Sequence, residues 1–436
     1  MYPDPTPPSA LTHALPTSER QRWQQLLLAL LCMLAISSPQ YVWTLFTKPL
    51  AARLGAGLPE LQVTFSLLIV VQTFLSPAQG WLIERLGPRR LLSAGGVLTG
   101  LSWVLAAHAD SLATLYLSYG VLGGLGTGTI YVGVIGLMTR WFPDRRGFAA
   151  GIAAAGYGMG AIATTFPITA SLSSRGLDAT LLWFGLGIGA IAVLAAQGIR
   201  APVGRVAPAS ARQPTRAFSP REMLRTPVFW LMFLMMTLMS TSGLMVISQM
   251  ATFTRDFGLA GSTVLGLAAL PLALTLDRVT NGLTRPFFGW LSDRLGRERT
   301  MALAFGFEGL AMTLWLLSRN DPTQFVLLSG VVFFGWGEIF SLFPATLTDT
   351  FGEAHGTVNY GFLYMAQGVG SILGGPLAAL LHQRTGSWLP VFAVVIACDL
   401  STAVLALAAL RPLRARLLAA SAWPEDTPAL RHARTA

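Results

Sequence analysis

The most informative stretch of this sequence is TLDRVTNGLTRPFFGWLSDRLGRER, which runs from Thr275 to Arg299. It places two arginines, Arg278 and Arg285, inside an otherwise apolar segment. If this segment crosses a membrane, an arginine kept inside it is costly and indicates a functional site. The last part of the stretch, GWLSDRLGR from Gly289, has an earlier counterpart in GWLIERLGPRR, which begins at Gly80. The two glycines are 209 positions apart, close to half the chain, so a repeated unit is indicated.

The composition places this unit in a membrane. Of the 436 residues, 53% are hydrophobic and only 11% are charged, which excludes an ordinary soluble domain. Apolar runs of about 20 residues recur, each long enough to cross the hydrocarbon core. The net charge of +10 comes from short basic clusters between these runs, which is the pattern of membrane topology and not of a nucleic-acid-binding face. Cys32 and Cys398 lie in apolar segments, so we expect packing thiols and neither a disulfide nor a metal site.

We therefore expect an all-α integral membrane protein with twelve transmembrane helices, whose ends are set to within about two to four residues. The expected spans are residues 23–51, 61–84, 91–107, 112–141, 147–173, 179–199, 228–253, 263–291, 301–318, 324–348, 358–382 and 389–410. They divide the chain into a disordered tail (1–22), a six-helix bundle (23–199), a flexible basic linker (200–226), a second six-helix bundle (227–411) and a second tail (412–436).

The basic residues also predict the orientation. Most of the 30 Lys and Arg residues lie in the two tails, the linker and the loops after even-numbered spans. Since such residues stay on the cytoplasmic side, both termini are expected there, in a multi-pass protein of the inner or plasma membrane. The proline-rich residues 1–20 lack the basic-then-apolar order of a cleaved signal peptide.

The repeat extends into the spans. A shift of 209 positions puts Gln72 on Asn281, and a shift of 210 puts Tyr157 on Gln367. Two parallel six-helix halves with a site between them, near the midplane, are the arrangement of major facilitator transporters. We therefore expect that fold, with two pseudo-symmetric bundles.

Each copy of the repeated loop combines an acidic residue with basic ones, at the cytoplasmic end of a helix. Such charges can hold two bundles together in one conformation and release them in another. The alternative is that they only fix the topology, but two copies in register favour a gate. The predicted gating residues are Glu84, Arg85, Arg89, Asp293, Arg294 and Arg297.

The candidate site lies on the eighth span. Because a helix turns 100° per residue, Arg278, Asn281 and Arg285 share one face, with Asp277 at its edge. Arg285 is about 12 Å and Arg278 about 22 Å from the cytoplasmic end of the span. A guanidinium binds a carboxylate through two hydrogen bonds, so a carboxylate substrate is expected. Arg278 either faces the cavity or pairs with Asp277 or Glu338, whereas Arg285 has no acidic residue within one turn.

Other polar and aromatic residues of the spans are candidates for the lining of the same cavity. A buried carboxylate can also load and release a proton, which makes Glu338 and Asp277 candidates for proton coupling, while Asp399 is expected to be structural. The candidate lining residues are Gln40, Tyr41, Gln72, Tyr131, Tyr157, Trp336, Tyr364 and Gln367.

Six short stretches resemble one known family. They are QYVWTL from Gln40, RWFPDRRG from Arg140, AAGYG from Ala154, NGLTRPFFG from Asn281, LFP from Leu342 and NYGF from Asn359. Their order and number, over nearly the whole chain, resemble the oxalate/formate antiporter family of the major facilitator superfamily, which is related to monocarboxylate transporters.

The resemblance implies roles for some of these residues. In the family's oxalate carrier, the arginine of an Arg-Pro step in the eighth helix binds carboxylate together with a lysine of the eleventh helix. Arg285 matches that arginine, but Gln367 stands in the place of the lysine and Phe340 in the place of a tyrosine. The positions that match the aromatic cage of that carrier are Tyr41, Tyr131, Tyr157 and Trp336.

These observations predict a secondary transporter of small organic anions that works by alternating access, through proton symport or anion exchange. A monocarboxylate is favoured because Gln367 leaves one positive charge fewer than a dianion needs. An oxalate:formate-type dicarboxylate antiporter is the alternative, and a drug or metabolite exporter is a weaker one. The five histidines lie in tails and loops, so we expect no enzyme, no metal and no cofactor. The expected partners are the substrate anion, the lipid bilayer and, in the symport alternative, a proton, with no nucleic acid and a monomer as the functional unit.

Overall fold

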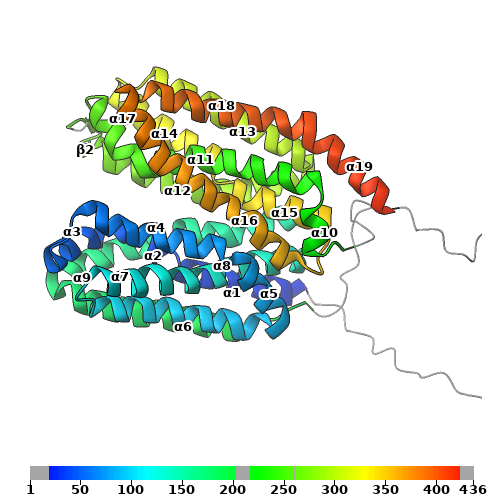
Figure 1. Ribbon diagram of the computed structural model, residues 1–436, viewed down its shortest axis with the longest axis horizontal. Helices are drawn as coiled ribbons and strands as arrows, with labels where there is room; N and C mark the ends of the chain where they lie inside the picture. The colour runs from blue at the N-terminus through cyan, green and yellow to red at the C-terminus, as the bar shows by residue number, and fades with distance from the viewer. Residues whose placement is uncertain (1–18, 203–216, 260, 423–436) are drawn as a thin grey trace, which may run out of the picture.

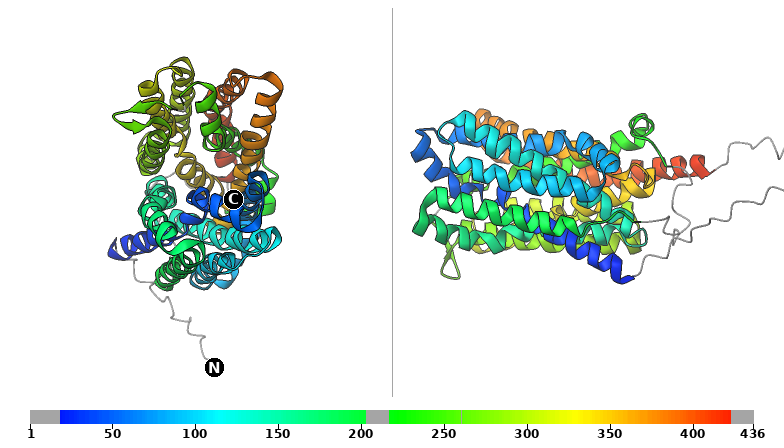
Figure 2. Two further views of the ribbon diagram at one scale, coloured as in Figure 1. Left: turned by 90° about the vertical axis from the view of Figure 1, so that its left-hand side faces the viewer. Right: turned by 90° about the horizontal axis from the view of Figure 1, so that it is seen from below.

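The computed structural model describes residues 19–202, 217–259 and 261–422. It forms two helical bundles that lie side by side, one from the first half of the chain and one from the second (Figure 1). α1 begins, and α9 and α19 end, at the same end of the molecule, which we call the linker end (Figures 1 and 2). The predicted tails and linker fall largely on residues 1–18, 203–216 and 423–436, which lie outside the described residues.

The first bundle consists of the helices before the linker. They are α1 (Glu19–Ala35), α2 (Ser38–Tyr41), α3 (Trp43–Leu54), α4 (Leu58–Phe74), α5 (Ser76–Leu86), α6 (Pro88–Ala107), α7 (Leu112–Leu115), the π-helical η1 (Tyr116–Leu122), α8 (Gly123–Trp141) and α9 (Arg146–Gln197).

The second bundle follows the linker and includes a two-residue hairpin, in which β1 (Thr263–Val264) pairs antiparallel with β2 (Leu267–Ala268). Its helices are α10 (Pro220–Leu224), α11 (Pro227–Asp256), α12 (Ala269–Leu295), α13 (Arg297–Leu317), α14 (Pro322–Trp336), α15 (Ile339–Phe351), α16 (Gly356–Ile372), η2 (Leu373–Leu377), α17 (Ala378–Thr385), α18 (Leu389–Leu405), η3 (Ala406–Leu410) and α19 (Arg411–Ala422).

The described helices account for the predicted spans. Eight of them are long and apolar enough to cross a membrane, or up to ten if each bent helix pair is one span. α9 holds two predicted spans, because Gly176, with φ of 80°, breaks its 52 residues. α12 carries several charged residues among its apolar ones, and it packs against α9, α13 and α14. With α9 counted twice and α12 added, the ten become the twelve expected.

Helix breaks follow from local sequence. Proline occupies the first turn of α5, α6, α11 and α14, where its missing N–H is not needed. The tenth predicted span breaks at Gly337 and Glu338, between α14 and α15. Irregular backbone at membrane depth is tolerated where it is buried in protein, and Glu338 is fully buried.

Glycines set the contact between the bundles at the linker end. A Cβ on Gly80 would lie 2.8 Å from the carbonyl oxygen of Thr357, and one on Gly289 would lie 2.1 Å from that of Gly147. Both distances are too short for any side chain, so glycine is required at these two repeat-related positions. The helices of opposite bundles therefore pack backbone to backbone here.

The chain stays helical beyond the expected end of the last span. In α19, Arg414 donates to Glu298 Oε1 at 2.6 Å and to Thr350 Oγ1 at 2.7 Å. The first part of the predicted tail 412–436 is thus a helix fixed to the second bundle.

Candidate functional site

Arg285 lies on α12, on its face toward the first bundle. Only 1% of the residue is exposed. Its Nε and Nη2 donate to Asn281 Oδ1 at 3.1 and 2.9 Å, and its Nη1 donates to the carbonyl oxygen of Ala154 in α9 at 2.6 Å. The guanidinium carbon lies 4.5 Å from the ring centroid of Phe340. Within the described ranges no carboxylate forms an ion pair with Arg285, so its charge is available for an anion.

Two glycines of α9 make room for this arginine. A Cβ on Gly151 would lie 2.3 Å from the carbonyl oxygen of Arg285, and one on Gly158 would lie 3.3 Å from its guanidinium carbon. The helices can therefore approach until the guanidinium reaches the opposite bundle.

Aromatic rings from both bundles meet beside Arg285. The ring of Tyr131 in α8 stacks on that of Tyr364 in α16, with centroids 4.7 Å apart and planes 12° apart. Tyr157 of α9 meets the ring of Tyr131 edge-on at 5.1 Å and that of Tyr41 at 5.6 Å. Rings predicted from separate spans thus form one cluster, which we call the tyrosine cluster (Tyr41, Tyr131, Tyr157 and Tyr364).

Amide side chains join this cluster into a hydrogen-bond network. Gln72 Nε2 donates to the hydroxyls of Tyr157 and Tyr364 at 3.2 and 3.1 Å. The Tyr157 hydroxyl donates to Gln40 Oε1. Gln72 therefore connects the two bundles through uncharged groups.

The remaining candidates lie at the edges of this centre. Trp336 is buried, and its Nε1 donates to the carbonyl oxygen of Met239 at 2.9 Å. Its ring meets that of Phe340 edge-on at 5.6 Å. Gln367 is 4% exposed, and its Oε1 accepts no hydrogen bond from any residue the structure describes.

The two alternatives for Arg278 can be compared with its contacts. Arg278 is half-buried and donates to the carbonyl oxygen of Tyr41 in the first bundle at 3.4 Å. Among the described ion pairs, none joins it to Asp277 or Glu338. Asp277 is buried and has Ser329 of α14 as a polar neighbour. Arg278 thus lies toward the first bundle and not on a carboxylate.

Glu338 belongs to a group of three buried carboxylates, which we call the acidic trio (Glu308, Glu338 and Asp399). All three residues are fully buried in the second bundle. Ser242 Oγ of α11 donates to Asp399 Oδ2 at 2.9 Å and lies 3.5 Å from Glu308 Oε1. Three carboxylates close together in a medium of low dielectric cannot all be ionised.

The trio differs from what the sequence suggested. Asp399 was expected only to be structural, and it lies in the interior of the second bundle, where α18 packs against α13. Glu308 was not among the candidates, although an ionisable residue in an apolar span is a sufficient signal by itself.

At the linker end, two carboxylates cross between the bundles. Glu84 Oε1 accepts from the backbone N–H groups of Thr357 and Val358 at 3.0 and 3.1 Å, at the start of α16. Asp293 accepts from those of Gly147 and Phe148 at 3.1 and 3.0 Å, at the start of α9. The acceptors Glu84 and Asp293 are 209 positions apart, and the donors Gly147 and Thr357 are 210 positions apart. The two contacts are therefore equivalent in the repeat, and we call them the paired clamp.

Further arginines surround the Asp293 contact. Arg297 donates to Asp293 at 2.6 Å and to Asp349 at 2.8 Å. Arg146 of the first bundle donates to Asp349 at 2.5 Å and to Glu353. Arg146 and Asp349 were not predicted, because these partners lie 203 positions apart.

The other predicted gating arginines stay within their own bundles. Arg85 lies over the ring of Trp81 at 5.1 Å, and Arg294 over that of Trp290 at 4.2 Å. Arg89 donates to Gln197 at 2.9 Å. Among the six predicted gating residues, hydrogen bonds to the opposite bundle are therefore made by the acidic ones, Glu84 and Asp293.

Comparison with known proteins gives the family. The model of the Major Facilitator Superfamily matches residues 26–277 and 269–435. The chain is 34% identical to the oxalate:formate antiporter of Oxalobacter formigenes over 86% of this chain and 88% of that protein. It is 27% identical to monocarboxylate transporter 13 of Bos taurus over 76% of this chain and 75% of that protein.

A solved structure supports the fold. The fucose:proton symporter of E. coli superimposes with a TM-score of 0.65 over 88% of this chain and 97% of its own, at 16% identity. The predicted twelve-helix fold is thereby confirmed, and these relatives are transporters and not enzymes. The chain belongs to the Major Facilitator Superfamily, and within it to the oxalate/formate antiporter family.

Proposed function

We propose that this protein is a secondary transporter that moves small carboxylate anions across a cell membrane by alternating access. The observation that carries this proposal is the buried guanidinium of Arg285, which contacts both bundles and has no described carboxylate partner. The names of the relatives support it, since one is an oxalate:formate antiporter and another a monocarboxylate transporter.

The charge at the centre favours a monocarboxylate. Arg285 supplies one permanent positive charge, while Gln367 and the tyrosine cluster supply only neutral groups. Arg278 lies two helical turns further along α12 and is engaged with the Tyr41 carbonyl. A dicarboxylate such as oxalate would need Arg278 to leave that carbonyl and turn toward Arg285, which is the alternative.

The paired clamp is the gate in this proposal. We assign the linker end to the cytoplasmic side, with both termini there, and a monomer as the working unit. The four N–H···O bonds of Glu84 and Asp293 hold the cytoplasmic side closed, so opening to the cytoplasm requires breaking them. Access then alternates when the two bundles rock apart at this end.

The acidic trio is the coupling element, and it favours proton symport over exchange. Gly337, which precedes Glu338, packs closely against α12. A Cβ at this position would lie 2.4 Å from Thr284 Cγ2 and 2.6 Å from the Asn281 carbonyl oxygen, so the trio is connected to the site. Asn281 in turn holds Arg285. A shift of Asn281 on substrate binding is therefore transmitted to Glu338, the residue after Gly337. Asp277 is the second candidate for the proton.

Uptake into proteoliposomes tests the function. Labelled lactate and oxalate are supplied to the reconstituted protein with and without an imposed inward proton gradient, and Arg285→Gln serves as the inactive control. Gradient-driven lactate uptake supports proton symport of a monocarboxylate. Oxalate uptake that requires internal formate or oxalate and ignores the gradient supports the exchange alternative. Uptake of neither anion above the control level contradicts the proposal.

A further inference from the structure

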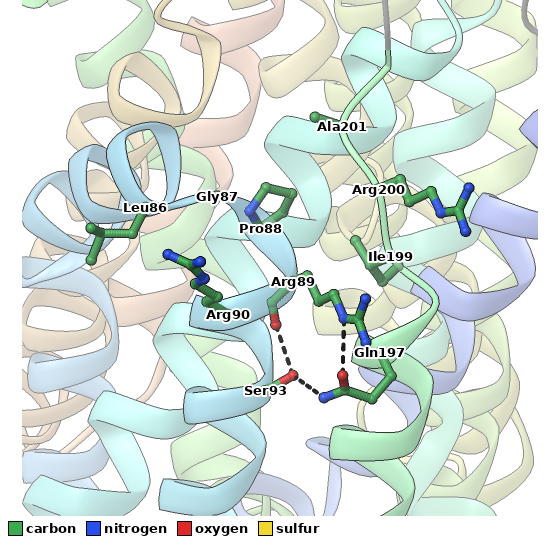
Figure 3. Close-up of a pocket in the computed structure, with 10 residues that line it drawn as sticks. All are labelled: Leu86, Gly87, Pro88, Arg89, Arg90, Ser93, Gln197, Ile199, Arg200 and Ala201. Carbon is green, nitrogen blue, oxygen red and sulfur yellow. Dashed lines mark hydrogen bonds between the residues drawn. The ribbon is translucent and has the colours of Figure 1, made fainter.

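A group of arginines lies away from Arg285, at the linker end of the first bundle. There a hollow of about 740 Å³ opens between the start of α6 and the end of α9 (Figure 3). Three arginines line it, namely Arg89, Arg90 and Arg200, together with Gln197 and Ser93.

The walls of the hollow are fixed by hydrogen bonds. Arg89 Nε donates to Gln197 Oε1 at 2.9 Å, and Gln197 Nε2 donates to Ser93 Oγ at 2.8 Å (Figure 3). The backbone of Arg200 is held on both sides, since its N–H donates to Gln25 at 2.8 Å and its carbonyl oxygen accepts from Trp141 at 2.8 Å. The guanidinium groups therefore project from anchored positions.

The repeat provides an internal control for this charge. A shift of 209 positions puts Arg89 on Glu298 and Arg90 on Arg299, which line a second hollow of about 340 Å³. In that hollow Arg414 of α19 donates to Glu298 at 2.6 Å. Its lining also includes three aspartates, Asp144, Asp293 and Asp349.

The two hollows thus differ in net charge. Five arginines and four carboxylates line the second hollow, whereas three arginines and no acidic residue are among the described residues that line the first. A general excess of positive charge on one side of the membrane does not predict this difference between equivalent positions. Three arginines that line one hollow, with no carboxylate among its described lining residues, can attract an oxygen-rich anion.

We propose that the first hollow binds the phosphate of an anionic phospholipid, taken from the membrane leaflet at the linker end. The apolar side chains around it favour a lipid over a soluble phosphate, because Leu86 at its edge is 47% exposed. Further along the same helices, Val97 of α6 and Leu194 of α9 are 54% and 73% exposed, as acyl chains require. Basic pockets at this depth between transmembrane helices suit anionic headgroups. This inference does not depend on the transported substrate.

Native mass spectrometry of the full-length protein tests it. The protein is released from nanodiscs of phosphatidylcholine with and without phosphatidylglycerol, and retained lipid is counted. Arg90→Gln with Arg200→Gln is the test variant. Arg299→Gln with Arg416→Gln is the control, because these exposed arginines of the second bundle give the same change in net charge. The test variant should retain phosphatidylglycerol about tenfold more weakly, and the control should match the wild type.

Three results would overturn the proposal. One is equal loss of lipid in both double variants, which would indicate only diffuse surface charge. Another is undiminished retention in the test variant. A third is displacement of the lipid by soluble glycerol phosphate, which would indicate a soluble anion. Because Arg90 and Arg200 are exposed, the test variant should melt at the wild-type temperature in phosphatidylcholine alone, so a loss of lipid is not a loss of fold.

Discussion

The two bundles contribute different chemistry at the depth of Arg285. The first bundle supplies uncharged groups, from Gln40, Gln72, Tyr131 and Tyr157. Its buried arginines in the described residues, Arg22 and Arg146, lie at the linker end. The second bundle supplies the ionisable side chains, which are Asp277, Arg278, Arg285 and the acidic trio.

The comparison shows where the two halves stay alike. At the gate, Glu84 and Asp293 make equivalent contacts to opposite helix starts. At the centre, the repeat pairs Gln72 with Asn281 and Tyr157 with Gln367, but the two residues of each pair make different contacts. Symmetry is thus retained where both halves must open and close together. Symmetry is absent around Arg285, because one charged side chain of the second bundle that faces uncharged side chains of the first is sufficient to hold one anion.

The largest effect is expected from removing the charge of the second bundle. Arg285→Gln should lower carboxylate uptake by at least about a hundredfold, since two charge-assisted hydrogen bonds to the substrate are lost. Uptake into proteoliposomes measures it, with the amount of reconstituted protein as the control. Arg278→Gln should have a much smaller effect on lactate. An equal loss in both variants would show that the substrate spans two positive charges.

The next effect concerns the acidic trio. Glu338→Gln should lower gradient-driven uptake about tenfold while leaving exchange of labelled for unlabelled substrate intact, because only the proton-carrying group is changed. The variant should also melt at a higher temperature, since an amide is cheaper to bury than a carboxylate. Comparing uptake with and without the gradient separates the two steps. Unchanged dependence on the gradient would assign the trio a structural role.

The paired clamp should respond unequally in its two halves. Asp293 uses both oxygens and is supported by Arg297, whereas Glu84 accepts both bonds through Oε1, and among the described residues its Oε2 has only the His355 imidazole, 3.7 Å away. Asp293→Asn should therefore shift the population toward an open linker end several-fold more than Glu84→Gln, because it also leaves Arg297 without one partner.

Spin labels can measure this shift. They are placed at the exposed, repeat-related positions Arg90 and Arg299, after Cys398→Ala and Cys32→Ala. The distance distribution between the labels reports the opening directly. Equal populations in the two clamp variants would mean that the arginine network adds nothing to the gate.

Much of this organisation could be predicted from the sequence. The spans, the repeat and the shared face of Asn281 and Arg285 follow from apolar runs and helical periodicity. The position of the paired clamp, which we propose as the gate, follows from the repeated loop. These features depend on residues close in sequence, or on a fixed shift between copies.

The contacts between helices could not be predicted from the sequence, because they depend on which face of one helix packs against which other helix. Periodicity places Glu308 on its helix but does not bring it to Asp399, and it does not select the Ala154 carbonyl as a partner of Arg285. Likewise, the partners of Arg146 are set by the packing of α9 against the second bundle. Such contacts come from tertiary packing, which a single sequence without its fold does not specify.

The smallest effect should come from the uncharged hydroxyls of the tyrosine cluster, to which both bundles contribute. Tyr364→Phe removes one hydrogen bond from Gln72 but keeps the ring that stacks on Tyr131, so KM should rise only about two- to fivefold, at a cost of roughly 0.5–1 kcal/mol. Tyr157→Phe should cost more, since it loses bonds to both Gln72 and Gln40. Initial rates of lactate uptake over a range of concentrations measure both. If either variant lost transport as fully as Arg285→Gln, the hydroxyls would be binding substrate directly. The distinction between a charged group that holds the anion and uncharged groups that only support it would then be wrong.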